Sequence, residues 1–411
     1  MADRRLSAAR RLSTAVRVRY RLTPWWLKVM AVFAVSRVVT TSILLFYAAR
    51  QESNAWTGAN PDYFDFAKMW DGHWYYIIAV AGYPTELPVT DDGYVGENAW
   101  AFMPAFPAIV RLLMFATGAS YSVLAVVVSV GFALAAALMF FKLMRLVLPG
   151  GTALFAVVLF CFAPLSPILQ VAYAESMQLF LLALALYLLV QRRYWIMLPV
   201  IAVMALTRPS GLAFAFTMLL HVGWRWWRRG HEPFPVGERV ASVVVGLFSA
   251  FMGVAWLLIA AAVTGSLTAY TDTELAWRSA YVGHGELLPF TPWVQAAGFW
   301  APWFGMPLPL LLVLLTLGVA AFFGALFLPA VRRLGPDIRF WLASYALYLL
   351  AVFFPQSSTF RLLMPLFPAL GAVAQPRSPW YRVGIVALFI AGQVAWVHIA
   401  WWVNGYDWSP P

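Results

Sequence analysis

The sequence predicts an all-α protein that crosses a membrane many times. Hydrophobic residues make up 63% of the chain and charged residues only 11%, whereas a soluble globular protein carries about 25% charged residues. Apolar runs that could cross a hydrocarbon core about 30 Å thick recur along the whole length. Within them the apolar residues are continuous and do not alternate with polar ones, which favours helices over the strands of a barrel.

The basic residues predict the topology of these spans. The formal net charge is +11, but the arginines flank the apolar runs, as in cytoplasmic connections, which argues against a nucleic-acid partner. The Arg-rich segment 1–26 is expected in the cytoplasm, facing anionic lipid. Alternation of the basic connections then gives about eleven spans, with the C-terminus extracytoplasmic. The predicted spans are 27–49, 120–144, 151–168, 175–191, 194–207, 210–224, 240–263, 302–330, 338–354, 361–374 and 382–403.

Two large loops fall outside on this topology. Residues 50–119 form the first extracytoplasmic loop, and eight of the seventeen acidic residues of the chain lie within its first 51 positions, 50–100. Residues 265–301 form the second. No internal repeat or low-complexity linker divides the chain, so residues 27–411 are expected to form a single transmembrane domain.

The first loop is expected to hold amphipathic helices at the membrane surface. After Pro61 the stretch 61–80 is predicted to be one helix, on which Asp65, Lys68 and Asp71 recur every three residues and share a face. An aspartate held where water, lipid and protein meet can act as a general base toward a hydroxyl. A solvated helix with its charges outward has the same spacing, so spacing alone leaves both interpretations open.

Several short motifs resemble one known family. The stretch WDGHWYYIIAVAGYP at 70–84, followed by Glu97 and by AFMPAFP at 101–107, resembles the first lumenal loop of the PIG-V mannosyltransferases. These enzymes add the second mannose to glycosylphosphatidylinositol and have bacterial relatives. Further along, YAES at 173–176, TRPSG at 207–211 and RLLMPLFP from Arg361 onward resemble later family motifs, in the right order. Met69, Pro209 and Ser210 depart from the family pattern.

The resemblance implies a membrane glycosyltransferase of the GT-C superfamily that takes its sugar, here expected to be mannose, from a polyprenyl-phosphate donor. It also implies a catalytic carboxylate in the first outer loop, which is Asp71 here. Arg208 and Arg361 lie at outer span boundaries, where guanidinium forks could bind the donor phosphate or snorkel to lipid head groups. The remaining candidate substrate-binding residues are Glu97, Trp70, Tyr75, Tyr83, Tyr173, Glu175, His73 and Lys68.

Neither a cofactor nor a metal is indicated, because the chain has no D-x-D pair and no His/carboxylate cluster at ligand spacing. The expected partners are the polyprenyl-phosphate sugar, a glycolipid or glycan acceptor and membrane lipids. The expected location is a bacterial plasma membrane. The alternative is a secondary transporter or lipid flippase, which also has many spans. A transferase needs Asp71, Arg208 and Arg361 to face one outer cavity, whereas a transporter needs polar groups near the bilayer midplane.

Overall fold

The computed structural model describes residues 22–285 and 287–404, and it confirms the all-helical fold. Within these residues an isolated bridge between Val89 and Val95 is the only β pairing. Most of the predicted cytoplasmic segment 1–26 and the predicted extracytoplasmic C-terminal end lie outside the described residues. Helices therefore carry the whole described architecture.

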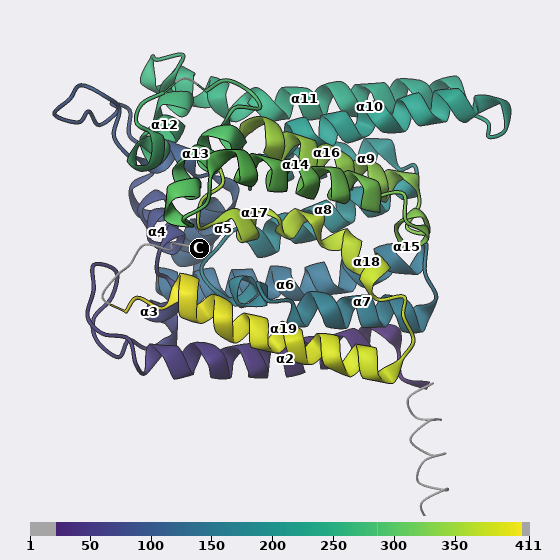
Figure 1. Cartoon of the computed structure of the whole chain (residues 1–411), viewed down its shortest axis with the longest axis horizontal. Coiled ribbons are helices and arrows are strands. Elements are labelled where there is room, and N and C mark those ends of the chain that lie inside the picture. Colours follow the sequence, from purple (N-terminus) through teal and green to yellow (C-terminus); the bar gives the residue numbers. More distant parts are fainter. Residues whose placement is uncertain (1–21, 286, 405–411) are drawn as a thin grey trace, which may run out of the picture.

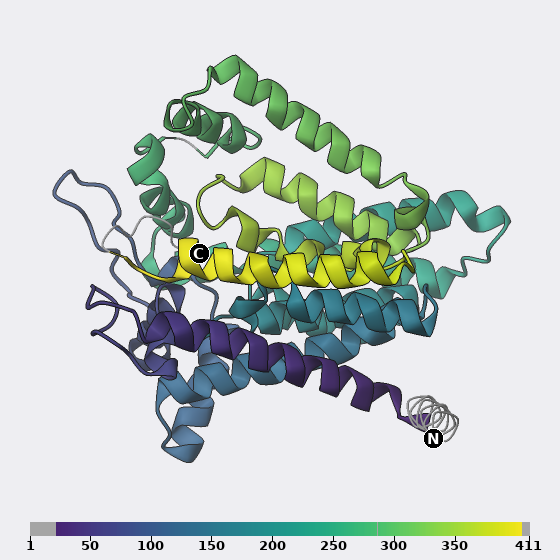
Figure 2. The same cartoon turned by 60° about the horizontal axis from the view of Figure 1, so that its bottom comes forward.

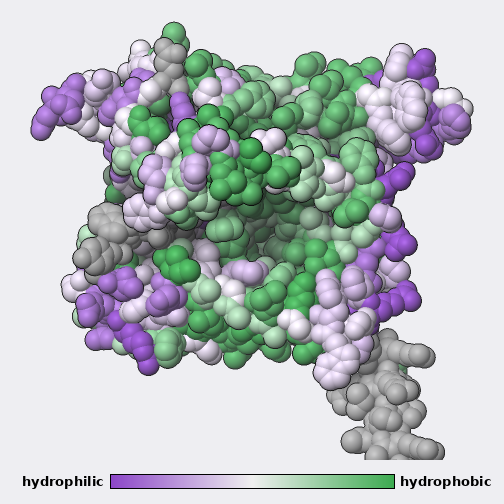
Figure 3. All heavy atoms as spheres, viewed as in Figure 1, coloured by the Kyte–Doolittle hydropathy of each residue, from purple (hydrophilic) through white to green (hydrophobic). Residues whose placement is uncertain are grey.

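Among the described residues, five helices are long and apolar enough to cross a membrane, as the continuous apolar runs predict. They run roughly parallel in Figure 1, and hydrophobic side chains cover the middle of the molecule in Figure 3, between two hydrophilic ends. They are α2 (Trp25–Ala48), α6 (Tyr121–Arg145), α11 (Val236–Thr264), α14 (Leu308–Ala325) and α19 (Pro379–Trp396), which continues as the π-helical turn Val397–Trp401.

The other helices are shorter. The remaining α-helices are α3 (Tyr63–Ala67), α4 (Asp71–Ala81), α5 (Ala105–Thr117), α7 (Gly150–Phe162), α8 (Glu175–Val190), α9 (Tyr194–Ala205), α10 (Gly211–Trp227), α12 (Ala269–Val282), α13 (Pro292–Trp303), α15 (Pro329–Arg332), α16 (Pro336–Val352), α17 (Thr359–Leu362) and α18 (Leu370–Val373). Short 3-10 turns are η1 (Ala99–Ala101), η2 (Ser166–Gln170), η3 (Arg228–Gly230) and η4 (Met364–Ala369).

Three of the predicted spans are broken. In the predicted span 151–168, α7 ends at Phe162 and η2 begins only at Ser166. The predicted span 302–330 is interrupted between α13 and α14, where Gly305 has a φ of 62° and Pro307 precedes the new helix. The predicted span 361–374 is divided into α17, η4 and α18, and Pro365 and Pro368 explain the division because proline cannot donate a helical hydrogen bond. The count of eleven spans therefore stays a prediction.

The single surface helix predicted over 61–80 is wrong. Helix α3 ends at Ala67 and α4 begins at Asp71. Between them Trp70 has a φ of 60° and a ψ of −127°. A helix cannot continue through a residue in this backbone conformation. Asp65 and Lys68 consequently do not share a helix face with Asp71.

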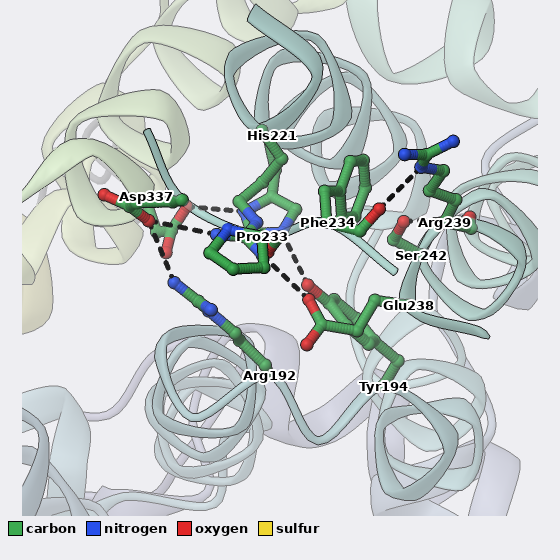
Figure 4. Close-up of polar contacts among 11 residues, drawn as sticks. Arg192, Tyr194, His221, Pro233, Phe234, Glu238, Arg239, Ser242 and Asp337 are labelled. Atoms are coloured by element: carbon green, nitrogen blue, oxygen red, sulfur yellow. Dashed lines mark hydrogen bonds and ion pairs between the residues drawn. The ribbon is translucent and has the colours of Figure 1, made fainter. Parts of the chain in front are cut away.

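The polar connections lie at two opposite ends of the bundle (Figure 1). We name them the loop end, which carries α3, α4 and α12, and the basic end, which carries the turns after α8 and α10. At the basic end a buried network joins α9, α10, α11 and α16 (Figure 4). His221 Nδ1 lies 2.7 Å from Asp337 and its Nε2 lies 2.9 Å from the Tyr194 hydroxyl, while Arg225 donates to Glu238 at 2.9 Å.

Candidate active site

Asp71 begins helix α4 directly after a strained bend at the loop end. A sparsely populated backbone conformation such as that of Trp70 costs about 1–3 kcal/mol. Contacts from the end of the chain offset this cost: Trp70 Nε1 donates to the Trp401 carbonyl at 3.3 Å, and Trp401 Nε1 donates to the Phe66 carbonyl at 3.1 Å. The two indoles thereby hold the bend that aims Asp71. Trp70, a predicted substrate-binding residue, is itself buried.

Helix α4 also lies directly against the segment that leads into α8. The Ala172 amide donates to the Ala67 carbonyl at 2.9 Å, and the Asp71 amide donates to the Tyr173 hydroxyl at 3.2 Å. A Cβ atom added to Gly72 would lie 3.3 Å from the Cβ of Ala172, so a side chain there would press the two segments apart. The glycine of the WDG motif thus permits the close approach of Asp71 to Tyr173.

Two carboxylates and two guanidinium groups meet at this point. Asp71 Oδ2 lies 2.5 Å from Arg361 Nη1 and 3.5 Å from Arg208 Nη2. Glu175, the first residue of α8, pairs closely with Arg208, and its Oε1 lies 3.5 Å from Arg361 Nε. Each arginine therefore contacts both acids, and each of the four side chains is at most 18% exposed. The formal charges of this charged cluster cancel.

The two arginines come from separate breaks between helices. Arg208 lies in the turn from α9 to α10. A Cβ at Gly211, the first residue of α10, would lie 2.6 Å from the Gly253 backbone, so α10 packs directly on α11 and holds this turn in place. Arg361 lies on the short helix α17, and its guanidinium lies 5.3 Å from the ring centre of Tyr173. The predicted topology placed both arginines on the same side of the membrane. The structure brings their guanidinium groups to the same two carboxylates.

Three buried polar atoms in or beside the cluster have no hydrogen-bond partner within the described chain. They are Nε of Arg361, the second carboxylate oxygen of Glu175, Oε2, and the hydroxyl of Tyr75. A buried polar atom without a hydrogen bond costs about 1–3 kcal/mol. Buried polar atoms without partners, next to a cluster of paired charges, are typical of a binding site in which a polar ligand supplies the missing hydrogen bonds.

Two of the sequence candidates lie apart from the cluster. Lys68 pairs with Asp65 at 3.2 Å and does not contact Asp71. His73 is exposed and lies against Trp56, with 5.9 Å between the ring centres. Partial burial, and then the charge of Lys68, lower the pKa of His73.

Two other candidates, Tyr83 and Glu97, lie together beside α4. Both line a cavity of about 300 Å³. The Tyr83 hydroxyl donates to the Phe102 carbonyl at 2.9 Å, whereas Glu97 makes no hydrogen bond or ion pair with the described residues. This cavity is separate from the charged cluster, although both border α4.

Sequence reasoning did not single out Arg37, which lies in the middle of α2. Its guanidinium donates to the carbonyls of Cys161 and Ser166 at 2.9 and 3.0 Å and to Gln170 Oε1 at 2.9 Å. These acceptors belong to the end of α7 and to η2, directly before Tyr173. An ionisable residue inside an apolar run is itself a signal of a special role, and that signal could have identified Arg37.

No group of three His, Cys, Asp or Glu side chains that could hold a metal ion occurs in residues 22–285 and 287–404. The cluster carboxylates are instead paired with arginines. This arrangement can bind an anion at the guanidinium groups and accept a proton at a carboxylate.

Comparisons with known proteins give a family match and distant structural neighbours. The family described as Mannosyltransferase (PIG-V) matches residues 25–230, half of the chain. No curated protein matches. The oligosaccharyltransferase AglB from Archaeoglobus fulgidus, solved with an inhibitory peptide and a dolichol-phosphate, superposes with a TM-score of 0.43 at 12% identity, over 89% of this chain and 54% of that one.

A second Archaeoglobus fulgidus oligosaccharyltransferase structure, tethered to an acceptor peptide by a disulfide bond, gives a TM-score of 0.42 at 13% identity over the same shares of the two chains. The present chain thus spans about half the length of these neighbours. The matched family segment contains Asp71, Glu175 and Arg208, whereas Arg361 lies beyond it.

Proposed function

Because this chain belongs to the mannosyltransferase (PIG-V) family, we propose that it moves mannose from a polyprenyl-phosphate donor to a glycolipid or glycan acceptor of a bacterial cell envelope. It is a membrane glycosyltransferase, and the proposed site is the charged cluster at the loop end, on the extracytoplasmic face. The observation that carries the proposal is the meeting of Asp71 with Arg208 and Arg361.

The arginines are suited to the donor phosphate. Guanidinium groups bind phosphate oxygens through two parallel hydrogen bonds, and such charge-assisted bonds are about twice as strong as neutral ones. In the cluster they face carboxylates, which also accept paired hydrogen bonds. A phosphate group that enters the cluster would therefore compete with Asp71 and Glu175 for Arg361 and Arg208.

Asp71 is proposed as the general base. The acceptor oxygen attacks the anomeric carbon of the sugar, a new C–O bond forms, and the bond from that carbon to the phosphate oxygen breaks. The electron pair of the broken bond remains on the phosphate, and the acceptor proton moves to Asp71. The phosphate leaves as an anion, so no acid is needed to protonate it.

The charges of the cluster change in step with this reaction. The donor phosphate carries one negative charge before transfer and gains a second when its bond to the sugar breaks. Asp71 becomes neutral in the same step, because it takes the acceptor proton. Arg361, which contacts Asp71 at 2.5 Å and Glu175 at 3.5 Å before the reaction, thereby loses one of its two protein counter-charges as the phosphate gains charge. Stabilising charge where it develops is the largest contribution to many enzymatic rates.

A hollow on the hydrophobic surface suits the donor lipid. In Figure 3 it opens between α14 and α19, and Figure 1, from the same side, shows α17 and α18 between these helices. Helix α14 has no buried residue, and Figure 2 shows it standing away from the other helices. An isoprenoid chain in this hollow would place its phosphate near α17, which carries Arg361.

The transporter alternative has buried polar groups within the long helices in its favour: Arg37 lies in the middle of α2, and Thr40 of the same helix donates to Gln393 of α19 at 2.8 Å. The acceptors of the Arg37 guanidinium are two backbone carbonyls, the Gln170 amide and the Ser36 hydroxyl, so its hydrogen bonds hold the segment before α8 against α2. Family membership supports the glycosyltransferase instead. Arg37 is accordingly proposed to position Tyr173 and Glu175.

The test of the function is transfer of radiolabelled mannose by the purified full-length protein in lipid nanodiscs. Polyprenyl-phosphate mannose serves as the donor, and an extract of envelope glycolipids and glycans serves as the acceptor. Label should appear in the extract with the wild-type protein. Absence of transfer from polyprenyl-phosphate mannose, glucose and arabinose alike would contradict the proposed donor class.

A further inference from the structure

The cavity beside α4 has a lining that the proposed chemistry does not use. Its volume of about 300 Å³ is at the lower end of small-molecule sites, which measure about 300–1,000 Å³. One wall is a face of α4, and the other walls come from the loop that follows it and from the start of η1. The lining residues are Trp74, Ile77, Ala81, Gly82, Tyr83, Pro84, Glu97, Asn98 and Ala99.

Two polar groups of this lining are free to bind a ligand. Within the described chain neither the indole Nε1 of Trp74 nor the carboxylate of Glu97 has a hydrogen-bond partner. The other polar side chains are occupied: the Tyr83 hydroxyl donates to Phe102, and Asn98 donates to Thr273 at 2.9 Å. The cavity thus offers one donor and one charged acceptor, and desolvation around Glu97 raises the pKa of this carboxylate.

The aromatic part of the lining is held rigidly. Trp74 lies parallel to Phe102, with 5.8 Å between ring centres and an interplanar angle of 11°. Trp277 meets Trp74 edge-on at 5.4 Å. Phe102 and Trp277 fix the orientation of the Trp74 ring. The half-buried indole therefore presents a flat apolar surface, and binding a ligand does not have to order this side chain at a cost in conformational entropy.

A sugar residue matches this combination of groups. A pyranose ring has a face of C–H groups that packs on an aromatic ring, and hydroxyls on its rim that both donate and accept hydrogen bonds. The rim hydroxyls could donate to Glu97 and accept from Trp74 Nε1. Glu97 is exposed and therefore hydrated in the free protein, so a purely apolar ligand that covered it would remove its water without replacing the lost hydrogen bonds, which is unfavourable.

The position of the cavity relates it to the charged cluster. Trp74 follows Asp71 by three residues on α4, so the two Cα atoms are separated by less than one helical turn of about 5.4 Å along the axis. We infer that the cavity is a subsite for a second sugar residue of the acceptor, adjacent to the sugar whose hydroxyl Asp71 deprotonates. This inference rests on the proposed function and makes the acceptor a chain of at least two sugar residues.

The experiment compares two acceptor probes that share one lipid tail, octyl α-mannoside and octyl α-mannobioside, with polyprenyl-phosphate mannose as the donor. The wild-type protein should show a kcat/KM about tenfold or more higher for the mannobioside, because one charge-assisted hydrogen bond contributes at least that much. Glu97→Gln should raise the KM for the mannobioside by a similar factor. Its effect on the kcat/KM for the mannoside, which does not reach the subsite, should be clearly smaller.

A matched control is available in the same loop. Glu86 is exposed and does not line the cavity, so Glu86→Gln should leave both acceptors unaffected. Equal kcat/KM for the two probes, or an equal effect of Glu97→Gln on both, would overturn the subsite and leave the transferase in place. Labelling of envelope extract with transfer to neither probe would also overturn it. Absence of any labelling would instead contradict the proposed function.

Discussion

The Asp71→Asn variant tests whether Asp71 is a catalytic base or a carboxylate with only a structural role. The substitution preserves the shape of the side chain and removes its negative charge. Both kcat and the donor KM are expected to fall, for different reasons. The kcat should fall because asparagine cannot accept the acceptor proton, whereas the apparent KM for the donor should also fall because Arg361 and Arg208 lose a competitor for the phosphate.

The structure sets the size of both effects. Loss of a general base lowers the rate by about 10²–10⁴-fold. Asp71 holds Arg361 at 2.5 Å and Arg208 at 3.5 Å, and a hydrogen bond to a charged group contributes about 1.5–3 kcal/mol. Release of one such bond should therefore lower the donor KM by about one to two orders of magnitude.

The assay measures initial rates of mannose transfer against donor concentration in nanodiscs, together with direct binding of polyprenyl phosphate to the same preparations. Two substitutions in the same loop serve as controls. Asp62 caps α3 by accepting from the Asp65 amide, a role that asparagine also fills. Asp65 makes only the exposed pair with Lys68, which contributes about 0–1 kcal/mol. Asp62→Asn and Asp65→Asn should therefore retain most of the activity.

Two results would refute this reasoning. A near-wild-type kcat in Asp71→Asn would exclude Asp71 as the base. A low kcat with a raised donor KM and weaker binding of polyprenyl phosphate would indicate that Asp71 orders the arginines for the phosphate and does not compete with it.

Three further predictions concern the donor, stability and topology. Arg361→Lys keeps the charge but loses the fork, so the donor KM should rise about tenfold or more; an unchanged donor KM in Arg361→Ala would assign the residue to structure. His221→Ala removes two buried hydrogen bonds, so Tm should fall while kcat stays within about twofold, because His221 lies ten residues, or about 15 Å, along α10 from Gly211. Cysteines at Asn60 and Gly283 should react with an impermeant reagent in intact cells; labelling only after permeabilisation would reverse the predicted orientation.

The sequence by itself determined the helical membrane fold and the position of the candidate base. Continuous apolar runs form helices in lipid because every backbone amide and carbonyl must be paired within its own segment, and this requirement is local. The WDG motif is also local, so Asp71 could be identified without a structure. The predicted same-side placement of Arg208 and Arg361 followed from the alternation of basic connections.

Only the tertiary structure decided how these residues meet. The bend at Trp70 depends on Trp401, a residue 331 positions away along the chain, so helical periodicity could not reveal that the predicted helix 61–80 divides. Likewise, Asp71 and Arg361 are separated by 290 positions. Ion pairs between buried groups form only when packing removes water and holds both partners in place, and that depends on how all the helices pack, which no local pattern records.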